Sequence, residues 1–193
     1  MGHVACMLDR PHLIGSEIYR HSVYGKRHPL SIARVSSTLD MIRALGWFDE
    51  ASYIDSPLAT FEQLTTFHAP DYVEAVMAAE RKGEVSETDR ERYNIGRNGN
   101  SVFPEIFRRP ATSVGATLLA VELLARGGIV HNPAGGTHHG LKNWASGFCY
   151  FNDPAIGILA MQDRGWRAAY VDLDAHHGDG VEIAFHDDPD VLT

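Results

Sequence analysis

Apolar residues recur every three or four positions in the first part of the chain, which is the spacing of an α-helix. They are Ile32, Val35, Leu39, Ile42 and Leu45. Pro29 precedes this series and Gly46 follows it, and proline suits the first turn of a helix as glycine suits its end. The pattern therefore predicts a helix over 29–45.

Local end signals predict two short helices further along the chain. Thr60 followed by Gln63 is the signature of a capping box, so we expect a helix that begins there and ends near Phe67. Pro70 then opens a second predicted helix over 71–77.

The middle of the chain contrasts a polar stretch with an apolar one. Residues 83–100 are polar and include Gly96 and Gly99, which predicts a long exposed loop. Residues 110–125 are strongly apolar and run into Gly127, which predicts a helix with a glycine at its C-terminal end.

Short apolar runs and helical segments alternate in the second half of the chain. The predicted strands cover 129–131, 168–171 and 191–192. Between them, Asn152 caps a helix that Gly165 ends, and a shorter helix covers 181–186. Such an order implies parallel strands with right-handed crossovers. We therefore expect an α/β fold of three layers, a mainly parallel sheet with helices on both faces, with its ligand site at the carboxyl ends of the strands.

Composition narrows the class of protein. The 193 residues are 44% hydrophobic and 22% charged, which is typical of one globular domain. Lys and Arg number 17 against 25 Asp and Glu, a net charge of -8, so direct binding of nucleic acid is not expected. The sequence predicts neither a secretory leader nor a membrane span. Two cysteines, Cys6 and Cys149, make no disulfide framework, and we expect a cytoplasmic protein.

The candidate chemistry lies in two segments that each follow a predicted strand. The first is 135–140, Gly-Gly-Thr-His-His-Gly, and the second is 172–180, Asp-Leu-Asp-Ala-His-His-Gly-Asp-Gly. In the first, glycines give the backbone the freedom that lets the adjacent His138 and His139 face the same way. Two neutral imidazoles side by side can serve as general base and general acid. A solvated loop without catalytic function is the alternative.

In the second segment, alternate residues of an extended strand point to one face, so Asp172, Asp174 and His176 would project together. Carboxylates and an imidazole at a buried strand end are costly unless they pair or bind a cation. A carboxylate and an imidazole two residues apart can share a divalent ion, and zinc accepts such ligands. The alternative is a loop held by salt bridges and hydrogen bonds. The density of ionisable residues favours metal binding.

Three blocks of this sequence resemble the zinc-dependent histone deacetylase family, which includes bacterial acetoin-utilisation proteins and acetylpolyamine amidohydrolases. They are residues 135–139, 145–153 and 170–181. Weaker resemblance extends upstream to His28 with Arg34, to 66–72 and to 100–104. The resemblance implies the fold that arginases and deacetylases share. It also implies that residues 1–193 are the N-terminal portion of a single catalytic domain, truncated at the C-terminus.

The resemblance further implies metal ligands. Asp174 and His176 match two of the family's three zinc ligands, and Fe²⁺ is an alternative because Asp and His sites accept several divalent ions. The third ligand, an Asp, and the Tyr that stabilises the oxyanion lie in the family's C-terminal half and have no match here. Backbone oxygens around Asp172, Asp174 and His176 match a structural K⁺ site, and Phe185 falls near a second one.

Catalytic roles follow from the same resemblance. His139 matches the general base that takes a proton from the attacking water. His138 matches the histidine that assists electrostatically and protonates the leaving amine. Asp172 and Asp179 match the carboxylates that hydrogen-bond these two histidines and set their tautomers.

Substrate contacts are also implied by the resemblance. Gly147 and Phe148 match the floor and one wall of the acyl-lysine channel. Cys149 matches a residue beside the acetyl pocket, and Arg34 matches an arginine of an internal cavity near the site.

Other positions have structural or divergent matches. His28 and His68 match family positions at turn entries, where we expect structural hydrogen bonds. No carboxylate aligns at Gly99 and Asn100, near where many family members carry an aspartate that binds the substrate backbone. This difference favours a small substrate or a different rim.

Together these matches predict a metal-dependent amide hydrolase that removes acetyl groups from acetyl-lysine or small N-acetyl amines and releases acetate. An arginase-type ureohydrolase is disfavoured, because its two-metal site needs an Asp where this chain has Gly178. The second alternative is a catalytically incomplete fragment that acts as a metal-binding or interaction module. Neither a nucleic acid nor a membrane is expected as a partner, and the sequence leaves a homo-oligomer open.

Overall fold

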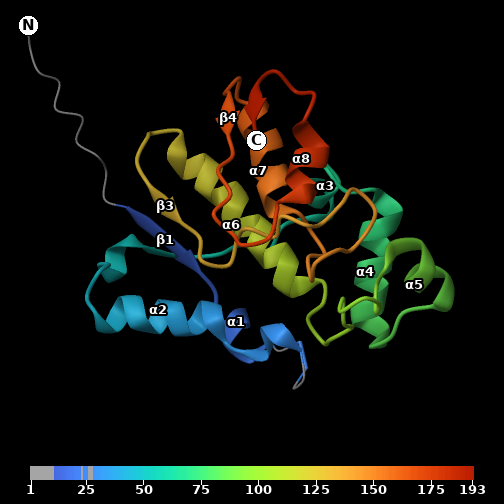
Figure 1. Ribbon diagram of the computed structural model, residues 1–193. Coiled ribbons are helices and arrows are strands. Elements are labelled where there is room, and N and C mark those ends of the chain that lie inside the picture. Colours follow the sequence, from blue (N-terminus) through green and yellow to red (C-terminus); the bar gives the residue numbers. More distant parts are fainter. Residues whose placement is uncertain (1–10, 23, 26–27) are drawn as a thin grey trace, which may run out of the picture.

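The structure, a computed structural model, describes residues 11–22, 24, 25 and 28–193 (Figure 1). Cys6 lies outside the described residues. The strands are β1 (His12–Gly15), β2 (Tyr53–Asp55), β3 (Val130–His131), β4 (Ala168–Ala169) and β5 (Val191–Leu192). In this part of the chain they form one sheet of order β2-β1-β3 and a second of order β4-β5. Every pairing between these strands is parallel, as predicted.

Helices pack around these strands. They are α1 (Ile18–His21), α2 (Arg34–Ala44), α3 (Phe61–Leu64), α4 (Pro70–Lys82), α5 (Glu87–Tyr93), α6 (Arg108–Leu124), α7 (Asp153–Gln162) and α8 (Asp179–Phe185). Two 3-10 turns, Pro29–Ser31 and Glu50–Ser52, precede α2 and β2. In Figure 1 the first sheet lies between α2 and α6, and α6 packs along α7. The strands thus have helices on both sides, as the alternating pattern predicts.

A small apolar cluster joins α2 to the first sheet. Leu39 and Ile42 of α2 pack with Leu13 of β1. The N-terminal boundary predicted for this helix is wrong. Pro29–Ser31 forms a 3-10 turn, and Ile32 after it is extended (ψ 132°) and exposed, so the regular helix begins only beyond that residue.

The polar stretch over 83–100 is not the exposed loop that its composition predicts. The side chain of Ser86 accepts a hydrogen bond from the backbone N–H of Asp89 (3.1 Å) and begins α5. Tyr93 and Ile95 are buried and belong to the main core between α4, α6 and α7. Two apolar side chains therefore fold this stretch onto the domain, despite its polar composition.

Two predicted helix starts are confirmed in atomic detail. Thr60 Oγ1 accepts a hydrogen bond from the N–H of Gln63 (3.2 Å), and Gln63 Oε1 accepts one from the N–H of Thr60 (2.9 Å). Asn152 Oδ1 accepts from the N–H of Ala155 (2.9 Å) and begins α7. Such side-chain caps satisfy backbone donors that have no partner inside the helix.

The apolar run 168–171 forms a strand only in its first half. The residues of β4 pair with those of β5, and the N–H of Tyr170 donates to Leu192 O (2.7 Å). Beyond this bond the chain leaves the sheet, and Val171 is 76% exposed. The predicted strand over 168–171 therefore ends at Ala169, where the ladder with β5 ends, and its predicted burial is wrong, because Ala168 is only half-buried and Ala169 is exposed.

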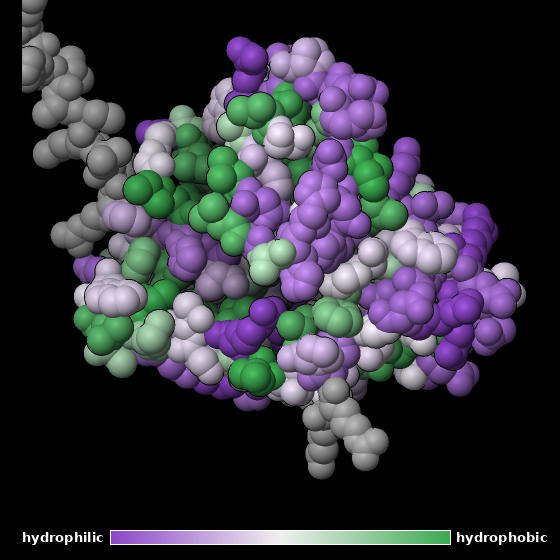
Figure 2. All heavy atoms as spheres, in the orientation of Figure 1, coloured by the Kyte–Doolittle hydropathy of each residue, from purple (hydrophilic) through white to green (hydrophobic). Residues whose placement is uncertain are grey.

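The surface has no uniform character. Figure 2 shows hydrophilic residues gathered over α4 and α5, and apolar residues interspersed with polar ones elsewhere on the same face. None of the helices among the described residues is long and apolar enough to cross a membrane.

Candidate active site

The start of α7 holds the loop that carries the tandem histidines. The backbone N–H groups of Thr137 and Gly136 donate to the Asp153 carboxylate (2.8 and 3.2 Å). On the other side of the histidines, the Asn152 amide donates to Gly140 O (2.9 Å). Gly136 has a φ of +88°, which favours glycine. Complete burial raises the pKa of Asp153, although its hydrogen bonds oppose this. Consecutive residues of one helix start therefore anchor the loop at two points.

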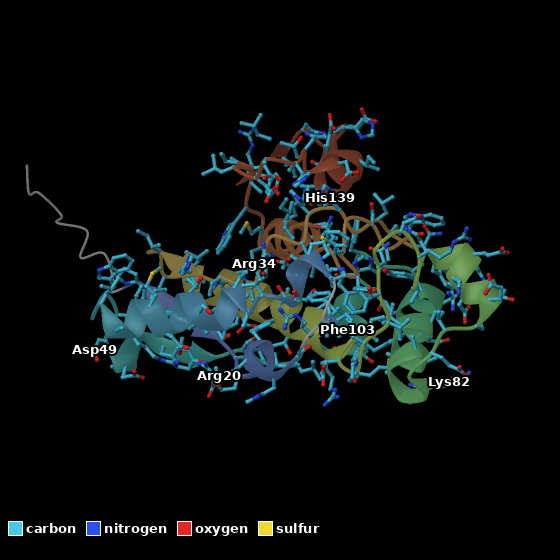
Figure 3. The ribbon with its side chains drawn as sticks, turned by 60° about the horizontal axis from the view of Figure 1, so that its bottom comes forward. Arg20, Arg34, Asp49, Lys82, Phe103 and His139 are labelled. Carbon is cyan, nitrogen blue, oxygen red and sulfur yellow. The ribbon has the colours of Figure 1, made fainter. Side chains whose placement is uncertain are left out.

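Each tandem histidine is paired with an aspartate. His138 Nδ1 lies 2.6 Å from Asp172 Oδ2, and His139 Nδ1 lies 2.6 Å from Asp179 Oδ1. We call these the His138 pair and the His139 pair. A carboxylate accepts hydrogen bonds only, so each Nδ1 carries a proton and each Nε2 of a neutral ring is left as an acceptor. The two rings are 4.1 Å apart, and Figure 3 shows His139 between the α8 end of the molecule and its centre.

The two pairs differ in burial. The side chains of His138 and Asp172 are 7% and 23% exposed, whereas those of His139 and Asp179 are 18% and 45% exposed. Burial alone would raise the pKa of Asp172, but hydrogen bonds from Tyr170 and His138 outweigh it and lower the pKa to about 2. The Asp172 carboxylate is therefore ionised under all physiological conditions.

Glycines permit this close packing. A Cβ on Gly178 would collide with the Asp172 carboxylate, and a Cβ on Gly147 would collide with the His139 ring. Gly147 also has a φ of +52°, a conformation that other residues seldom adopt. A larger residue at either position would displace one of the pairs.

Asp174 and His176 form the candidate metal-binding pair. Asp174 Oδ1 lies 2.9 Å from His176 Nδ1 and also accepts the backbone N–H of His176 (2.8 Å). Their side chains are 54% and 79% exposed, and the His176 ring lies 6.2 Å from that of His139. A carboxylate and an imidazole suit zinc, but the described residues contain no cluster of three or more such ligands. The pair fits two ligand positions of a metal site.

The route by which Asp172, Asp174 and His176 come together differs from the one predicted. They do not lie on an extended strand, because β4 ends before them. Instead, the N–H of Asp174 donates to Asp172 Oδ1 (2.9 Å), and the N–H of His176 donates to Asp174. Successive side-chain-to-backbone bonds thus replace the strand.

Phe148 is held in an unusual conformation next to the histidines. It has a φ of +68°, its N–H donates to Asn100 Oδ1 (3.0 Å), and its ring meets His28 edge-on at 4.7 Å. A Cβ on Gly99 would collide with this ring. Asn100 is fully buried and was placed in an exposed loop by composition, so sequence reasoning missed its contact with Phe148.

Cys149 and Arg34 have contrasting environments. Cys149 is buried, and burial raises the pKa of its thiol to about 12, so it stays protonated. Arg34 is exposed in the first turn of α2 and is labelled in Figure 3. In the described chain Leu39 and Ile42, and not Arg34, form the apolar buried face of α2, so the internal position that the resemblance implies for Arg34 stays a prediction. A role of Arg34 in substrate binding stays a prediction.

His28 and His68 make the structural hydrogen bonds that were expected of them. His68 Nε2 accepts from the N–H of Asn152 (2.9 Å), its Nδ1 donates to Lys142 O (3.3 Å), and burial lowers its pKa to about 4. His28 Nε2 donates to Gly99 O (2.9 Å). His68 thus supports the helix start that anchors the histidine loop.

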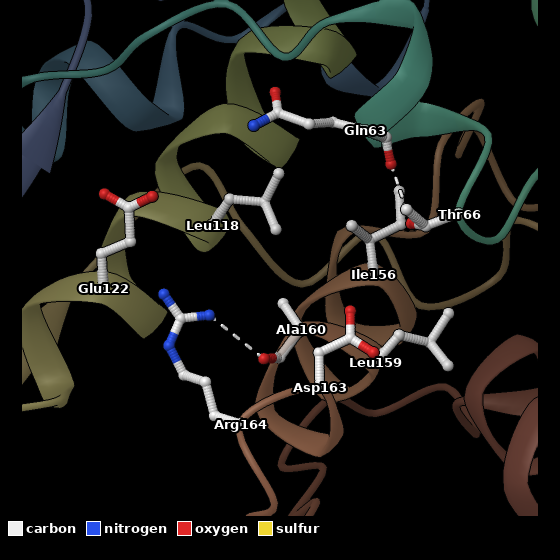
Figure 4. Close-up of a pocket in the computed structure, with 9 residues that line it drawn as sticks. All are labelled: Gln63, Thr66, Leu118, Glu122, Ile156, Leu159, Ala160, Asp163 and Arg164. Atoms are coloured by element: carbon white, nitrogen blue, oxygen red, sulfur yellow. Dashed lines mark hydrogen bonds between the residues drawn. The ribbon is translucent and has the colours of Figure 1, made fainter.

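Two hollows of the described chain differ in their surroundings. One, of about 210 Å³, lies between α3, α6 and α7, has an apolar floor and contains none of the predicted site residues (Figure 4). The other, of about 260 Å³, is lined by Tyr170, Asp172, His177, Gly178, Glu182 and Thr193. Of these two hollows, only the second is lined by a member of a histidine–aspartate pair, Asp172.

Comparison with known proteins identifies the family of this chain. The pattern of the histone deacetylase domain matches residues 28–193. The chain belongs to the histone deacetylase family. It is 37% identical over 183 residues to the acetoin utilization protein AcuC of Bacillus subtilis (strain 168) and 36% identical over 162 residues to histone deacetylase 8 of Xenopus tropicalis. These alignments cover 93% and 83% of this chain, and 47% and 44% of the relatives.

A solved structure of this deacetylase family has the same fold. The crystal structure of a histone deacetylase homologue from Aquifex aeolicus superposes with a TM-score of 0.91 at 43% identity, over 95% of this chain and 50% of that one. The predicted three-layer α/β class is thereby confirmed. The chain spans about half the length of the relatives that it matches.

Proposed function

We propose that this chain is the N-terminal half of a deacetylase catalytic domain that hydrolyses acetyl-lysine or small N-acetyl amines and releases acetate. The observation that carries the proposal is the placement of two histidine–aspartate pairs, with rings 4.1 Å apart, beside the Asp174–His176 pair. General acid–base groups next to a divalent-metal ligand pair are the combination that metal-assisted amide hydrolysis requires. A cytoplasmic location fits this assignment.

Zinc is the metal that we propose, with Fe²⁺ as the alternative, and Asp174 and His176 would hold it. We place the third protein ligand in the part of the domain that this chain does not cover. A bound divalent ion would polarise the acyl carbonyl and lower the pKa of a water molecule. We also propose that the backbone oxygens around Asp172 bind a structural K⁺.

Proton transfer is assigned to the two imidazoles. With Nδ1 donating to Asp179, His139 has a free Nε2 that can accept a proton from the attacking water. Asp179 then stabilises the imidazolium that forms. His138 donates Nδ1–H to the ionised Asp172, so it can donate from Nε2 to the leaving amine only as an imidazolium that has first taken up a second proton there. The more exposed pair thus faces water, and the more buried pair faces the amine.

Substrate would be gripped beside these rings. We propose that Gly147 and Phe148 border the channel for the aliphatic stem of the acylated amine and that Cys149 lies against the acetyl group. The protonated thiol of Cys149 is apolar in character and suits a methyl group. Phe148 has a left-handed backbone conformation, and its ring lies against His28.

The test is acetate release by a lengthened protein, in which this chain is fused to the C-terminal half of AcuC from Bacillus subtilis. We expect zinc-dependent release of acetate from an acetyl-lysine peptide or from an N-acetylated polyamine, and its loss in His139→Ala. A lengthened protein that binds zinc but releases acetate from neither substrate would overturn the proposal.

A metal-binding or interaction module is the second candidate, favoured by the two-ligand site. It predicts that the 193-residue chain binds one divalent ion and that the lengthened protein adds no hydrolysis. Metal stoichiometry and acetate release, measured on both proteins, separate the two functions.

A further inference from the structure

Tyr170 lies directly after β4, and its hydroxyl reaches the His138 pair. Tyr170 OH donates to Asp172 Oδ2 at 2.6 Å, and the same oxygen accepts the Nδ1–H of His138 at 2.6 Å. The other carboxylate oxygen accepts the backbone N–H of Asp174 at 2.9 Å. Three donors therefore converge on one carboxylate, two from the segment around Asp172 itself and one from the histidine loop, and together they fix its position and its rotation.

The His139 pair has no equivalent of this hydroxyl. Within the described chain, Asp179 Oδ1 accepts from His139 Nδ1 and from the N–H of the adjacent Gly180 (2.9 Å), and no tyrosine, serine or threonine donates to it. Its carboxylate is also about twice as exposed as that of Asp172. Tyr170 is thus the feature that distinguishes the two otherwise similar pairs.

Close packing at one point supports a specific role for the hydroxyl. A Cβ on the buried Gly178 would lie 3.3 Å from His138 Nδ1 and 3.4 Å from Tyr170 OH, and would collide with Asp172. All three groups therefore meet around this glycine. Tyr170 and Asp172 also line the hollow of about 260 Å³. The Tyr170 hydroxyl therefore donates to a carboxylate oxygen that would otherwise accept a hydrogen bond from water.

We propose that Tyr170 is a positioning residue for His138: its hydroxyl holds the Asp172 carboxylate in the orientation that binds Nδ1–H and directs Nε2 of His138 toward the reacting amide. The direction of Nε2 toward a reacting amide rests on the proposed function, whereas the hydrogen bonds among Tyr170, Asp172 and His138 do not depend on it. Tyr170 and Asp172 are only two residues apart in the segment that follows β4, so the contact is a local one.

The test uses the whole 193-residue chain with ¹⁵N-labelled histidine and follows the Nδ1–H signals of His138 and His139 by NMR. Tyr170→Phe removes one hydroxyl and keeps the ring. The matched control is Tyr53→Phe, because Tyr53 OH also donates to an aspartate two residues on, Asp55 (3.1 Å), where no histidine follows.

We expect Tyr170→Phe to shift the His138 signal or to broaden it through faster exchange with water. The His139 signal should stay in place, and Tyr53→Phe should move neither. If both signals stay in place in Tyr170→Phe, or both move alike, the proposal is wrong. Tyr170→Leu provides the same comparison should the phenylalanine variant fail to fold by circular dichroism.

A second-site variant separates positioning from a general structural effect. In an Asp172→Asn background, the effect of Tyr170→Phe on the His138 signal should disappear, because the carboxylate that links the hydroxyl to His138 has been removed. An undiminished effect there would also contradict the proposal. Since no readout involves hydrolysis, an inactive lengthened protein would leave this inference standing, and unmoved signals would leave the proposed hydrolysis standing.

Discussion

The His138 pair and the His139 pair share a bond length of 2.6 Å but differ in everything that surrounds it. Asp172 is mostly buried and receives a tyrosine hydroxyl and a backbone N–H, whereas Asp179 is half exposed and receives only a neighbouring N–H. Identical hydrogen bonds thus have unequal support. The comparison teaches that the more strongly supported His138 pair suits proton donation to the amine at a fixed place, and that the more exposed His139 pair suits proton exchange with water.

Replacing each histidine in turn should have the largest effect and should show how the two pairs differ in their contribution to kcat. In the lengthened protein we expect His139→Ala to lower kcat by about 10³-fold, because a general base is lost. His138→Ala should lower it by about 10²-fold, because the proton donor to the leaving amine is lost. Both are measured by acetate release under saturating substrate, with far-UV circular dichroism as the control for folding. A larger loss in His138→Ala would reverse the assigned roles.

Acid should lower the stability of the protein through His68, which supports the helix start that anchors the histidine loop. His68 accepts the N–H of Asn152 and has its pKa lowered by burial to about 4, against an ordinary value near 6.5. The folded protein therefore resists protonation there, and stability is full above pH 6.5 and falls as the pH drops toward 4, by about 3 kcal/mol in total.

Urea unfolding across this pH range measures that fall. His68→Gln is the control, since it cannot titrate, and its stability should change less steeply over the same interval. Equal slopes in the two proteins would show that His68 does not account for the pH dependence, since the raised pKa of the buried Asp153 would act in the opposite direction.

A glycine substitution should disturb the His139 pair alone. Gly147→Ala places a methyl group against the His139 ring at a φ of +52° and should cost about 2–3 kcal/mol of unfolding free energy. Gly165→Ala is the matched control, because its φ is +73° with nothing near its Cβ, and it should cost about 1 kcal/mol. Equal costs in urea unfolding would mean that the ring contact is unimportant.

Metal binding by this chain should have the smallest effect. With two ligands from Asp174 and His176, zinc should raise the melting temperature by only about 1–2 °C, and Asp174→Asn should abolish that rise. Differential scanning fluorimetry with and without a chelator measures it. A large stabilisation by zinc would indicate ligands beyond this pair.

The fold could be predicted from the sequence where the signal is local. Two helix starts depend only on residues of the first turn, and both are confirmed: Thr60 with Gln63, and Asn152 with Pro154. The helix over 87–93 was missed because its anchors, Tyr93 and Ile95, reveal themselves only by burial against distant helices.

The site divides in the same way. The pairing of the tandem histidines with Asp172 and Asp179 followed from a family resemblance, because partners 34 and 40 residues apart leave no periodic signal. Asn100 behind Phe148 depends on a contact across 48 residues and could not be found. The contact between Tyr170 and Asp172 could have been predicted, because the two residues lie only two positions apart in the sequence.

The first sheet has a consequence for how this protein is made. Its central strand, β1, begins at His12, yet one of its two neighbours in the described chain is β3, whose Val130 pairs with that same residue. During synthesis, β1 and β2 can pair early, but one edge of β1 stays open until more than half of the chain has left the ribosome. An open strand edge is prone to pair with other chains. Fast translation through residue 131, or a chaperone that covers the nascent chain, should therefore raise the yield of folded protein.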